Sequence, residues 1–151
     1  PFNTFGPRQS QRAVIPTIIN QILNKKKKIK LGNINTKRDF VYVKDTCDAI
    51  YKLMKSSIKT NGQVFNISSE KTHSIKKIFF KIKKLLKSNC ILDIDNSRMR
   101  PIKSEEKLLL GSSKKIKKFC KFKISKNFDK GLSETISWCK NNIDQNTGYH
   151  L

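Results

Sequence analysis

Four segments of the chain place apolar residues three or four positions apart, which is the spacing of one face of an α-helix. We predict helices over residues 14–23, after a cap at or near Asp45, from Thr72 or Ser74 onward, and from Asp129 onward. Their apolar faces consist of Val14, Ile15, Ile18, Ile19, Ile22 and Leu23, of Ala49, Ile50, Leu53 and Met54, of Ile75, Ile78, Phe79, Ile82, Leu85 and Leu86, and of Leu132, Ile136 and Trp138. Lysines occupy the opposite face of the third helix, so that helix is expected to bury one side only.

Short β-rich segments alternate with these helices. Residues 28–31 are followed by Gly32, and residues 38–43 alternate in polarity, as expected for strands. Further strands are predicted at residues 64–67 and 91–94, and the turn-rich residues 1–7 predict a loop that leaves a strand. Short strands that alternate with amphipathic helices define an α/β fold. We expect one compact unit over residues 1–151.

The length of the chain and its first residues indicate its domain organisation. A chain of 151 residues is long enough for one domain with a real core. It contains no apolar run of the roughly 18 residues that a membrane span needs, so we expect no membrane partner. The chain opens with Pro1 inside a dense motif, which we interpret as the start of an internal fragment. The core of such a fragment would continue into the missing half, so marginal stability is expected.

The formal net charge of +22 raises the possibility of a nucleic-acid-binding module. Arginine, however, occupies only five of the 33 basic positions, and the lysines are spread along the chain. Nucleic-acid binders more often combine arginine with exposed aromatic residues, because guanidinium groups and ring faces bind phosphates and bases. We therefore interpret lysine runs such as residues 25–28 and 114–118 as solvated surface and expect no nucleic-acid partner.

The four cysteines, Cys47, Cys90, Cys120 and Cys139, form no Cys-x-x-Cys pair. Neither zinc-ligand spacing nor a compact disulfide framework is present, so no metal is expected. Scattered thiols without a visible secretory signal favour a reducing, cytoplasmic location. Each thiol is expected to act as a small buried apolar group.

The arginines stand outside the lysine runs, in a Gly-Pro-Arg loop, at the start of a strand, and before Pro101. In a chain that uses lysine for surface charge, arginine is expected where geometry matters, since its planar fork binds phosphates bidentately. Arg12 and Arg38 flank elements that could converge on a diphosphate. Surface salt bridges are the alternative for each arginine taken singly.

Six motifs follow one another over nearly the whole chain. They are PFNTFGPRQS at residues 1–10, RAVIP at 12–16, LG at 31–32, RDFVYVKDT at 38–46, GQVFNI at 62–67 and RMRP at 98–101. In this order they resemble the extended short-chain dehydrogenase/reductases of the NAD-dependent epimerase/dehydratase family. The similarity is strongest to nucleotide-sugar 4,6-dehydratases that act on activated N-acetylglucosamine. It implies the C-terminal, substrate-binding portion of an extended Rossmann-type fold, with the NAD-binding half absent.

The resemblance also implies roles for individual residues. Phe2 and Thr4 would lie against NAD, and Asn3 would hydrogen-bond the sugar. Arg38 would bind the diphosphate together with backbone groups at the start of the first helix. The substrate-binding positions implied in this way are Asn3, Arg12, Ala13, Val14, Ile29, Lys30, Leu31, Arg38, Asn66 and Arg100.

Simpler interpretations remain open for some of these residues. Asn3 could cap a turn, and Asn66 could satisfy its own backbone at the end of a strand. Asp39 is expected to orient a loop or to pair with an arginine rather than to act as a base.

No catalytic residue is expected in this chain, which lacks the Gly-rich turn that binds the NAD pyrophosphate. Tyr51 and Lys55 have the spacing of a Tyr-x-x-x-Lys pair, but they fall within a predicted helix, so we treat the match as chance. The resemblance implies an NAD-dependent lyase that oxidises the sugar at C4, eliminates water across C5 and C6, and returns the hydride to C6. A 4-epimerase is the nearest alternative. The expected partners are a nucleotide sugar and a second subunit in a homodimer.

Overall fold

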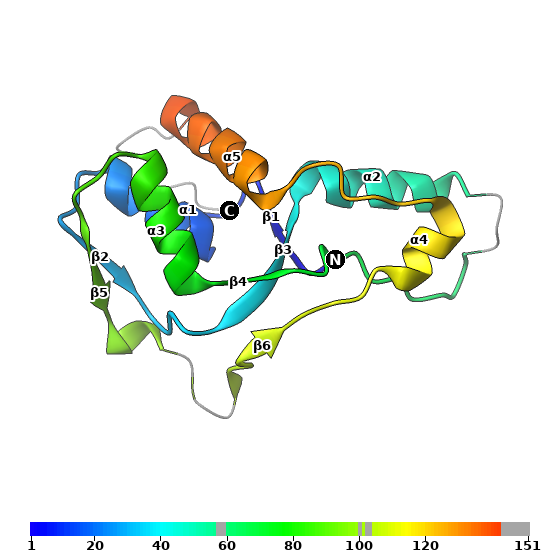
Figure 1. Ribbon diagram of the computed structural model, residues 1–151, viewed down its shortest axis with the longest axis horizontal. Coiled ribbons are helices and arrows are strands. Elements are labelled where there is room, and N and C mark those ends of the chain that lie inside the picture. The colour runs from blue at the N-terminus through cyan, green and yellow to red at the C-terminus, as the bar shows by residue number, and fades with distance from the viewer. Residues whose placement is uncertain (57–59, 100, 102–103, 143–151) are drawn as a thin grey trace.

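The computed structural model describes residues 1–56, 60–99, 101 and 104–142. Its elements alternate between short strands and helices, as an α/β fold requires (Figure 1). The strands are β1 (Asn3–Phe5), β2 (Lys28–Leu31), β3 (Lys37–Tyr42), β4 (Thr72–Ser74), β5 (Ile91–Ile94) and β6 (Leu108–Leu109). The helices are α1 (Val14–Leu23), α2 (Val43–Met54), α3 (Ile75–Leu85), the 3₁₀ turn η1 (Asn96–Arg98), α4 (Lys114–Cys120) and α5 (Phe128–Asn142). The α/β fold class predicted from the sequence is confirmed.

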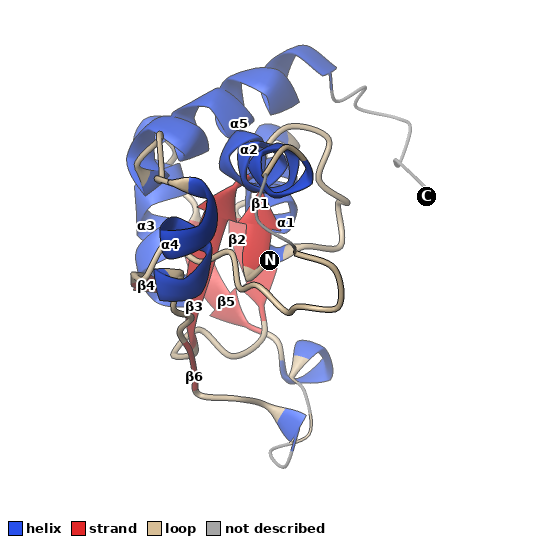
Figure 2. Ribbon diagram, turned by 90° about the vertical axis from the view of Figure 1, so that its right-hand side faces the viewer, coloured by secondary structure: helices blue, strands red, loops and turns tan. Residues whose placement is uncertain are grey.

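Strand β3 is the centre of the larger sheet. Its C-terminal half pairs in parallel with β1, with Asn3 opposite Phe40. Its N-terminal half pairs with β4 in the antiparallel sense and with β6 in the parallel sense. A separate parallel pair joins β2 to β5, with Lys30 opposite Asp93. Helices cover both faces of the strands, as Figure 2 shows.

The alternation of side chains along β3 divides the core into two clusters. Phe40 and Tyr42 point into the larger cluster with residues of α1, α3 and α5. Val41 points the other way, into a smaller cluster with Ala49 of α2 and Ile116 of α4. Successive residues of a strand face opposite sides of the sheet, so this division follows directly from the strand assignment. Figure 1 shows the same division, with α1, α3 and α5 at one end and α2 and α4 at the other.

Four local expectations from the sequence are wrong. Residues 64–67 form no strand; Ile67 instead accepts a backbone hydrogen bond from the Phe2 N–H (2.8 Å). Asp45 does not cap α2, because the helix begins two residues earlier. Asp129 is not the capping residue of α5, since the Asn127 side chain accepts a hydrogen bond from the Lys130 N–H (2.9 Å). A further strand, β1, occupies part of the predicted N-terminal loop.

The apolar face predicted for α2 is only partly buried. Ala49 is fully buried and Leu53 is half-buried, but Ile50 and Met54 are exposed. The helix packs against α4, β3 and β1, and the outer part of its apolar stripe stays open to solvent.

Carboxylates attach the C-terminal part of the chain to α2 and β3. The buried Asp45 carboxylate accepts hydrogen bonds from the Ser125 N–H (2.9 Å) and hydroxyl (2.5 Å). Glu134 of α5 accepts one from the Tyr42 hydroxyl (2.6 Å) and pairs with Lys126. Burial, and then the hydrogen bond to Glu134, raise the pKa of Tyr42 to about 12. Tyr42 is therefore protonated at neutral pH and has a structural role.

The expectation that all four cysteines are buried is wrong for Cys47. Cys90 and Cys139 are buried, Cys120 is half-buried, and Cys47 on α2 is exposed. Burial also raises the pKa of the Cys139 thiol to about 11.

Because the thiolate is the reactive form, we expect Cys47 to react first with a thiol reagent in the folded protein. Cys47→Ser should remove the fast phase of a 5,5′-dithiobis(2-nitrobenzoate) reaction, and a fast phase that survives would contradict this assignment.

Candidate substrate-binding site

A pocket of about 420 Å³ lies between the start of α1, the end of β2 and the first residues of β3. We call it the α1–β2 pocket. Its walls contain seven of the residues singled out by the sequence, namely Asn3, Arg12, Ala13, Val14, Lys30, Leu31 and Arg38. Segments that are far apart in the sequence thus supply one concave site.

The start of α1 provides a wall suited to an anion. The cap residue, Ala13, has extended backbone angles and makes no side-chain hydrogen bond to the helix, and the first turn contains no acidic residue. The N–H groups at a helix start carry partial positive charge and bind phosphate readily. A carboxylate in this turn would compete for those N–H groups, so its absence leaves the helix start compatible with a phosphate.

Positive side chains surround the same wall. Arg12 precedes α1, Arg38 comes from β3, and Lys30 comes from β2. Arg38 is half-buried, and its Nη1 donates to the Lys37 carbonyl (3.0 Å), which restricts the position of its guanidinium. Several cations around one small pocket favour an anionic ligand, and two arginine forks match the geometry of a diphosphate.

A fourth cation reaches the pocket because of a glycine. A Cβ atom on Gly32 would lie 2.4 Å from the Arg98 carbonyl oxygen, so only glycine allows η1 to pack against the end of β2. This close approach brings Arg98 into the pocket wall. The Arg98 Nε lies 3.4 Å from the carboxylate of Asp95, the residue that caps η1.

A carboxylate lies at one side of the pocket. Glu105 is half-buried and accepts a hydrogen bond from the Asn33 side chain (2.6 Å). Asn33 in turn accepts a hydrogen bond from the Asn35 N–H (3.0 Å), so the loop after β2 is held to the segment after residue 104. Glu105 partly offsets the positive charge of a pocket that remains strongly basic.

Asp39 faces away from the α1–β2 pocket, because it follows Arg38 on the same strand. Its carboxylate is fully buried and accepts hydrogen bonds from the Ser68 hydroxyl (2.5 Å), the Ser69 N–H (2.9 Å) and the Ser69 hydroxyl (2.6 Å). The N–H groups of Glu70 (3.2 Å) and Gly111 (3.3 Å) complete the set. Asp39 therefore orients two loops, and no ion pair of Asp39 with an arginine is present among the described residues.

The Asp39 network extends to α4 and to β1. Glu70 accepts from the Ser113 N–H (2.9 Å) and pairs with Lys117 (2.5 Å). The hydrogen bond to Lys117 is the largest of the effects that lower the Glu70 pKa. On the other side, the Asp39 carbonyl accepts from the Asn3 side chain (2.9 Å). The Asp39 carboxylate thus anchors the strand that carries Arg38, while its backbone carbonyl holds the Asn3 side chain.

Phe2 and Thr4, which the resemblance assigned to the cofactor, contact the chain itself. A Cβ on Gly111 would lie 2.4 Å from the Phe2 ring, which shows how closely that ring packs. The Thr4 hydroxyl lies 3.2 Å from the Thr46 hydroxyl. The six glycines of the chain do not form a Gly-x-x-Gly-x-x-Gly turn. The roles of Phe2 and Thr4 toward NAD stay predictions, and no chemical step is assigned to NAD within this chain.

Three other residues singled out by the sequence lie elsewhere. Ile29 is fully buried in the larger core cluster, because alternate residues of β2 point inward. Asn66 is exposed, outside the walls of the pocket. Arg100 lies outside the described residues. Tyr51 and Lys55 are on α2, with the Lys55 ammonium 4.8 Å from the centre of the Tyr51 ring rather than in the pocket.

The pocket wall also contains polar residues that were not predicted as site residues, among them Gln9, Thr17, Asn33 and Glu105. Gln9 donates to the Thr4 carbonyl (2.8 Å), and Thr17 lies one turn into α1. Thr17 could have been found from helical spacing, since residues 13, 14 and 17 share a face. Glu105 could not, because only tertiary folding brings its segment to the loop after β2.

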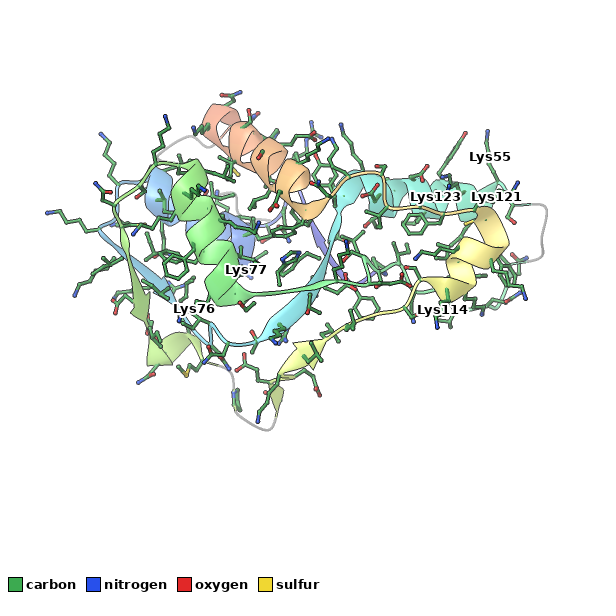
Figure 3. The ribbon with its side chains drawn as sticks, in the orientation of Figure 1. Lys55, Lys76, Lys77, Lys114, Lys121 and Lys123 are labelled. Atoms are coloured by element: carbon green, nitrogen blue, oxygen red, sulfur yellow. The ribbon has the colours of Figure 1, made fainter. Side chains whose placement is uncertain are left out.

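The lysines, in contrast, do not gather at this pocket. Figure 3 labels lysines of α3 near one end of the molecule and lysines of the α2 and α4 region at the other. Lys114, Lys121 and Lys123 are exposed to solvent, as are residues 25–28. Among the described residues, no helix is both long enough and apolar enough to cross a membrane.

The family to which this fold belongs follows from comparison with known proteins. The family model described as GDP-mannose 4,6 dehydratase matches residues 1–135, and the chain belongs to this family of NAD-dependent epimerases and dehydratases. The short-chain dehydrogenase/reductase resemblance is thereby confirmed.

Individual relatives have different activities. The chain is 31% identical over 145 residues to UDP-N-acetyl-alpha-D-glucosaminuronate decarboxylase of Bacillus cytotoxicus, covering 91% of this chain and 44% of the relative. It is 30% identical to the UDP-N-acetylglucosamine 4-epimerase of Methanobrevibacter ruminantium in complex with UDP-N-acetylmuramic acid, with a TM-score of 0.81 and coverage of 94% and 45%. The Bacillus cereus UDP-glucuronic acid 4-epimerase in complex with UDP-glucuronic acid and NAD shares the fold, with a TM-score of 0.83, 20% identity and coverage of 93% and 43%. The chain thus spans less than half the length of these relatives.

Proposed function

We propose that the chain is the substrate-binding part of an NAD-dependent nucleotide-sugar 4,6-dehydratase acting on a UDP- or GDP-activated N-acetylhexosamine. The observation that carries the proposal is the α1–β2 pocket, where Arg12, Arg38 and Arg98 surround the start of α1. A diphosphate placed there would accept hydrogen bonds from guanidinium forks and from helix N–H groups at the same time. The family match to 4,6-dehydratases supports the reaction class.

The role of the chain in this proposal is to position the substrate. Arg38 and the start of α1 hold the phosphates, while Asn3 places its side chain beside the pocket, fixed by the Asp39 carbonyl. Holding a substrate in a reactive orientation can contribute several kcal/mol to catalysis, on the order of 7 or more in favourable cases. We assign the transfer of hydride, and the residues that move protons, to an NAD-binding part outside the described residues.

A 4-epimerase is the second candidate, and the identity of 30% to an N-acetylglucosamine 4-epimerase favours it. The two reactions are distinguished by their products. In a protein that includes an NAD-binding part, UDP-N-acetylglucosamine should yield a product lighter by one water if the protein is a dehydratase. A product of unchanged mass with inverted C4 would show the epimerase instead.

Binding by the chain itself tests the substrate class. Isothermal titration should show that UDP-N-acetylglucosamine or a GDP-sugar binds the chain in a one-to-one complex and that duplex DNA does not displace it at physiological salt. Affinity for DNA that falls steeply with salt, with no sugar-nucleotide binding, would instead indicate a nucleic-acid-binding module. That outcome would overturn the proposal.

We further propose, as for many soluble enzymes with closed symmetry, that the intact protein is a homodimer of the cytoplasm.

A further inference from the structure

A second pocket lies at the other end of α1, away from the α1–β2 pocket. Its volume is about 710 Å³, and it shares no lining residue with the α1–β2 pocket. The last turn of α1, the loop after it, residues 86–91 and the end of α5 form its wall. We call it the helix-end pocket. Its volume falls in the range of about 300–1,000 Å³ that is typical of sites for small ligands.

The floor of the helix-end pocket is apolar. Its hydrocarbon and thiol side chains are Ile22, Leu23, Leu86, Cys90 and Ile91. Ile22 and Cys90 belong to the larger core cluster, and Leu23 and Leu86 pack against that cluster. Ile91, in contrast, is 55% exposed, so apolar surface continuous with the core reaches solvent here. An apolar ligand that covers this surface would remove it from water, which favours binding.

Every charged side chain in the wall of this pocket is a lysine. Lys25, Lys26 and Lys27 come from the loop after α1, and Lys140 comes from α5. All four are exposed, and none forms an ion pair with another of the described residues. The ends of α1 and α3 contribute partial negative charges of about half a unit each, which is less than four full positive charges. The wall therefore favours an anionic group.

The backbone of the lysine loop is fixed before any ligand binds. The Lys25 N–H donates to the Ile22 carbonyl (2.9 Å), and the Lys26 N–H donates to the Gln21 carbonyl (3.0 Å). These two bonds form the motif that commonly ends a helix with a left-handed residue, which is usually glycine. Lys25 occupies that position with φ of 55°. A cation thus stands at the pocket in a conformation that glycine would adopt with less strain.

We propose that the helix-end pocket binds a free fatty acid, with its hydrocarbon chain on the apolar floor and its carboxylate among the four lysines. The wall contains neither arginine nor an aromatic ring, the groups that bind nucleic-acid phosphates and bases. A bilayer surface is contacted by protruding apolar groups, whereas the apolar groups here line a concave floor. The proposal does not depend on the proposed function, because the two pockets are separate.

Titration calorimetry of the full chain with decanoate, below the concentration at which it forms micelles, tests the ligand class. Decanoate should bind in a one-to-one complex. Octanoate should bind about fivefold to fifteenfold more weakly, because each buried methylene contributes a factor of about four to affinity. Decyltrimethylammonium has the same chain with the opposite charge and should not bind. Absence of decanoate binding, or equal binding of the anion and the cation, would overturn the proposal.

Two variants with matched controls locate the binding site. Asn89→Trp places an indole in the exposed part of the pocket wall and should weaken decanoate binding at least tenfold. Asn61→Trp, in an exposed turn outside the pocket, should leave the affinity unchanged. Losses of equal size from Asn89→Trp and Asn61→Trp would show that decanoate binds elsewhere, contrary to the proposal.

A pair of charge variants separates the lysines of the pocket from general attraction. Lys26→Ala combined with Lys140→Ala should weaken decanoate binding about threefold to tenfold. Lys114→Ala combined with Lys123→Ala removes the same charge from the α2 and α4 end of the molecule (Figure 3) and should change the affinity less than twofold. Equal losses would show that the net charge of the chain, and not this pocket, attracts the carboxylate.

A further measurement uses the wild-type chain and does not depend on a variant that folds. Decanoate should shift the backbone amide resonances of Lys26, Asn89 and Cys90 in a ¹⁵N–¹H spectrum and leave that of Arg38 unchanged. Sedimentation with phosphatidylglycerol vesicles distinguishes a free acid from a membrane lipid with the same chemistry. The wild-type chain and Asn89→Trp should sediment equally with the vesicles. Stronger sedimentation of the wild-type chain would assign the pocket to a membrane lipid and overturn the assignment to a free acid.

Discussion

Replacing Asp39 by alanine is expected to lower the free energy of unfolding by about 3–5 kcal/mol, the usual cost of removing one partner from a buried charged network. The donors left behind are the hydroxyl and N–H of Ser69, the hydroxyl of Ser68, and the N–H groups of Glu70 and Gly111. Several of them are buried and would have no other acceptor nearby. Typical domains are stable by only about 5–15 kcal/mol, so this single change would remove a large fraction of the total.

Asp129 offers a matched control for this change. Its carboxylate is largely exposed and pairs with Lys81 at the surface. Exposed ion pairs contribute about 0–1 kcal/mol, so Asp129→Ala should have a small effect. Equilibrium unfolding in urea, followed by circular dichroism, measures both variants. Equal losses for the two substitutions would show that the Asp39 network does not hold the loops in solution.

Replacing Arg38 by alanine is expected to weaken sugar-nucleotide binding by about tenfold to a hundredfold while the fold persists. Hydrogen bonds to charged groups are worth about 1.5–3 kcal/mol, and each 1.4 kcal/mol is a factor of ten in affinity. Arg38 is half-buried in the pocket wall, where its charge is screened less than at the surface. Arg38→Lys keeps the charge but not the planar fork, so an intermediate loss is expected.

The control for charge is Arg8, the same residue type on an exposed turn outside the walls of the pocket. Arg8→Ala removes one positive charge from a chain of net charge +22 and should change the affinity less than threefold. Titration calorimetry with UDP-N-acetylglucosamine at two salt concentrations separates the two effects. If both variants lose affinity equally, a general electrostatic attraction accounts for binding, and the specific role of Arg38 is wrong.

Some features of the fold could be predicted because the local sequence decides them. Residues 14–23 form a helix, since isoleucines at helical spacing bury one face, and β2 ends just before Gly32, as the turn signal indicates. The strand at residues 64–67 was predicted from its β-rich composition, but no neighbouring strand pairs with it. A strand is stabilised by its partner, so composition alone is a weak guide.

The same contrast holds for the site. The motifs around Asn3, Arg12 and Arg38 identify the family because side-chain chemistry and spacing are written in the sequence itself. The tertiary structure decides which side chains from distant segments come into contact. Asp39 is buried because strand alternation turns it away from Arg38, and Gln21 reaches Lys30 only because α1 packs beside β2. Hydrogen bonds between distant segments depend on positions to within a few tenths of an ångström, and the packing of the whole core sets those positions.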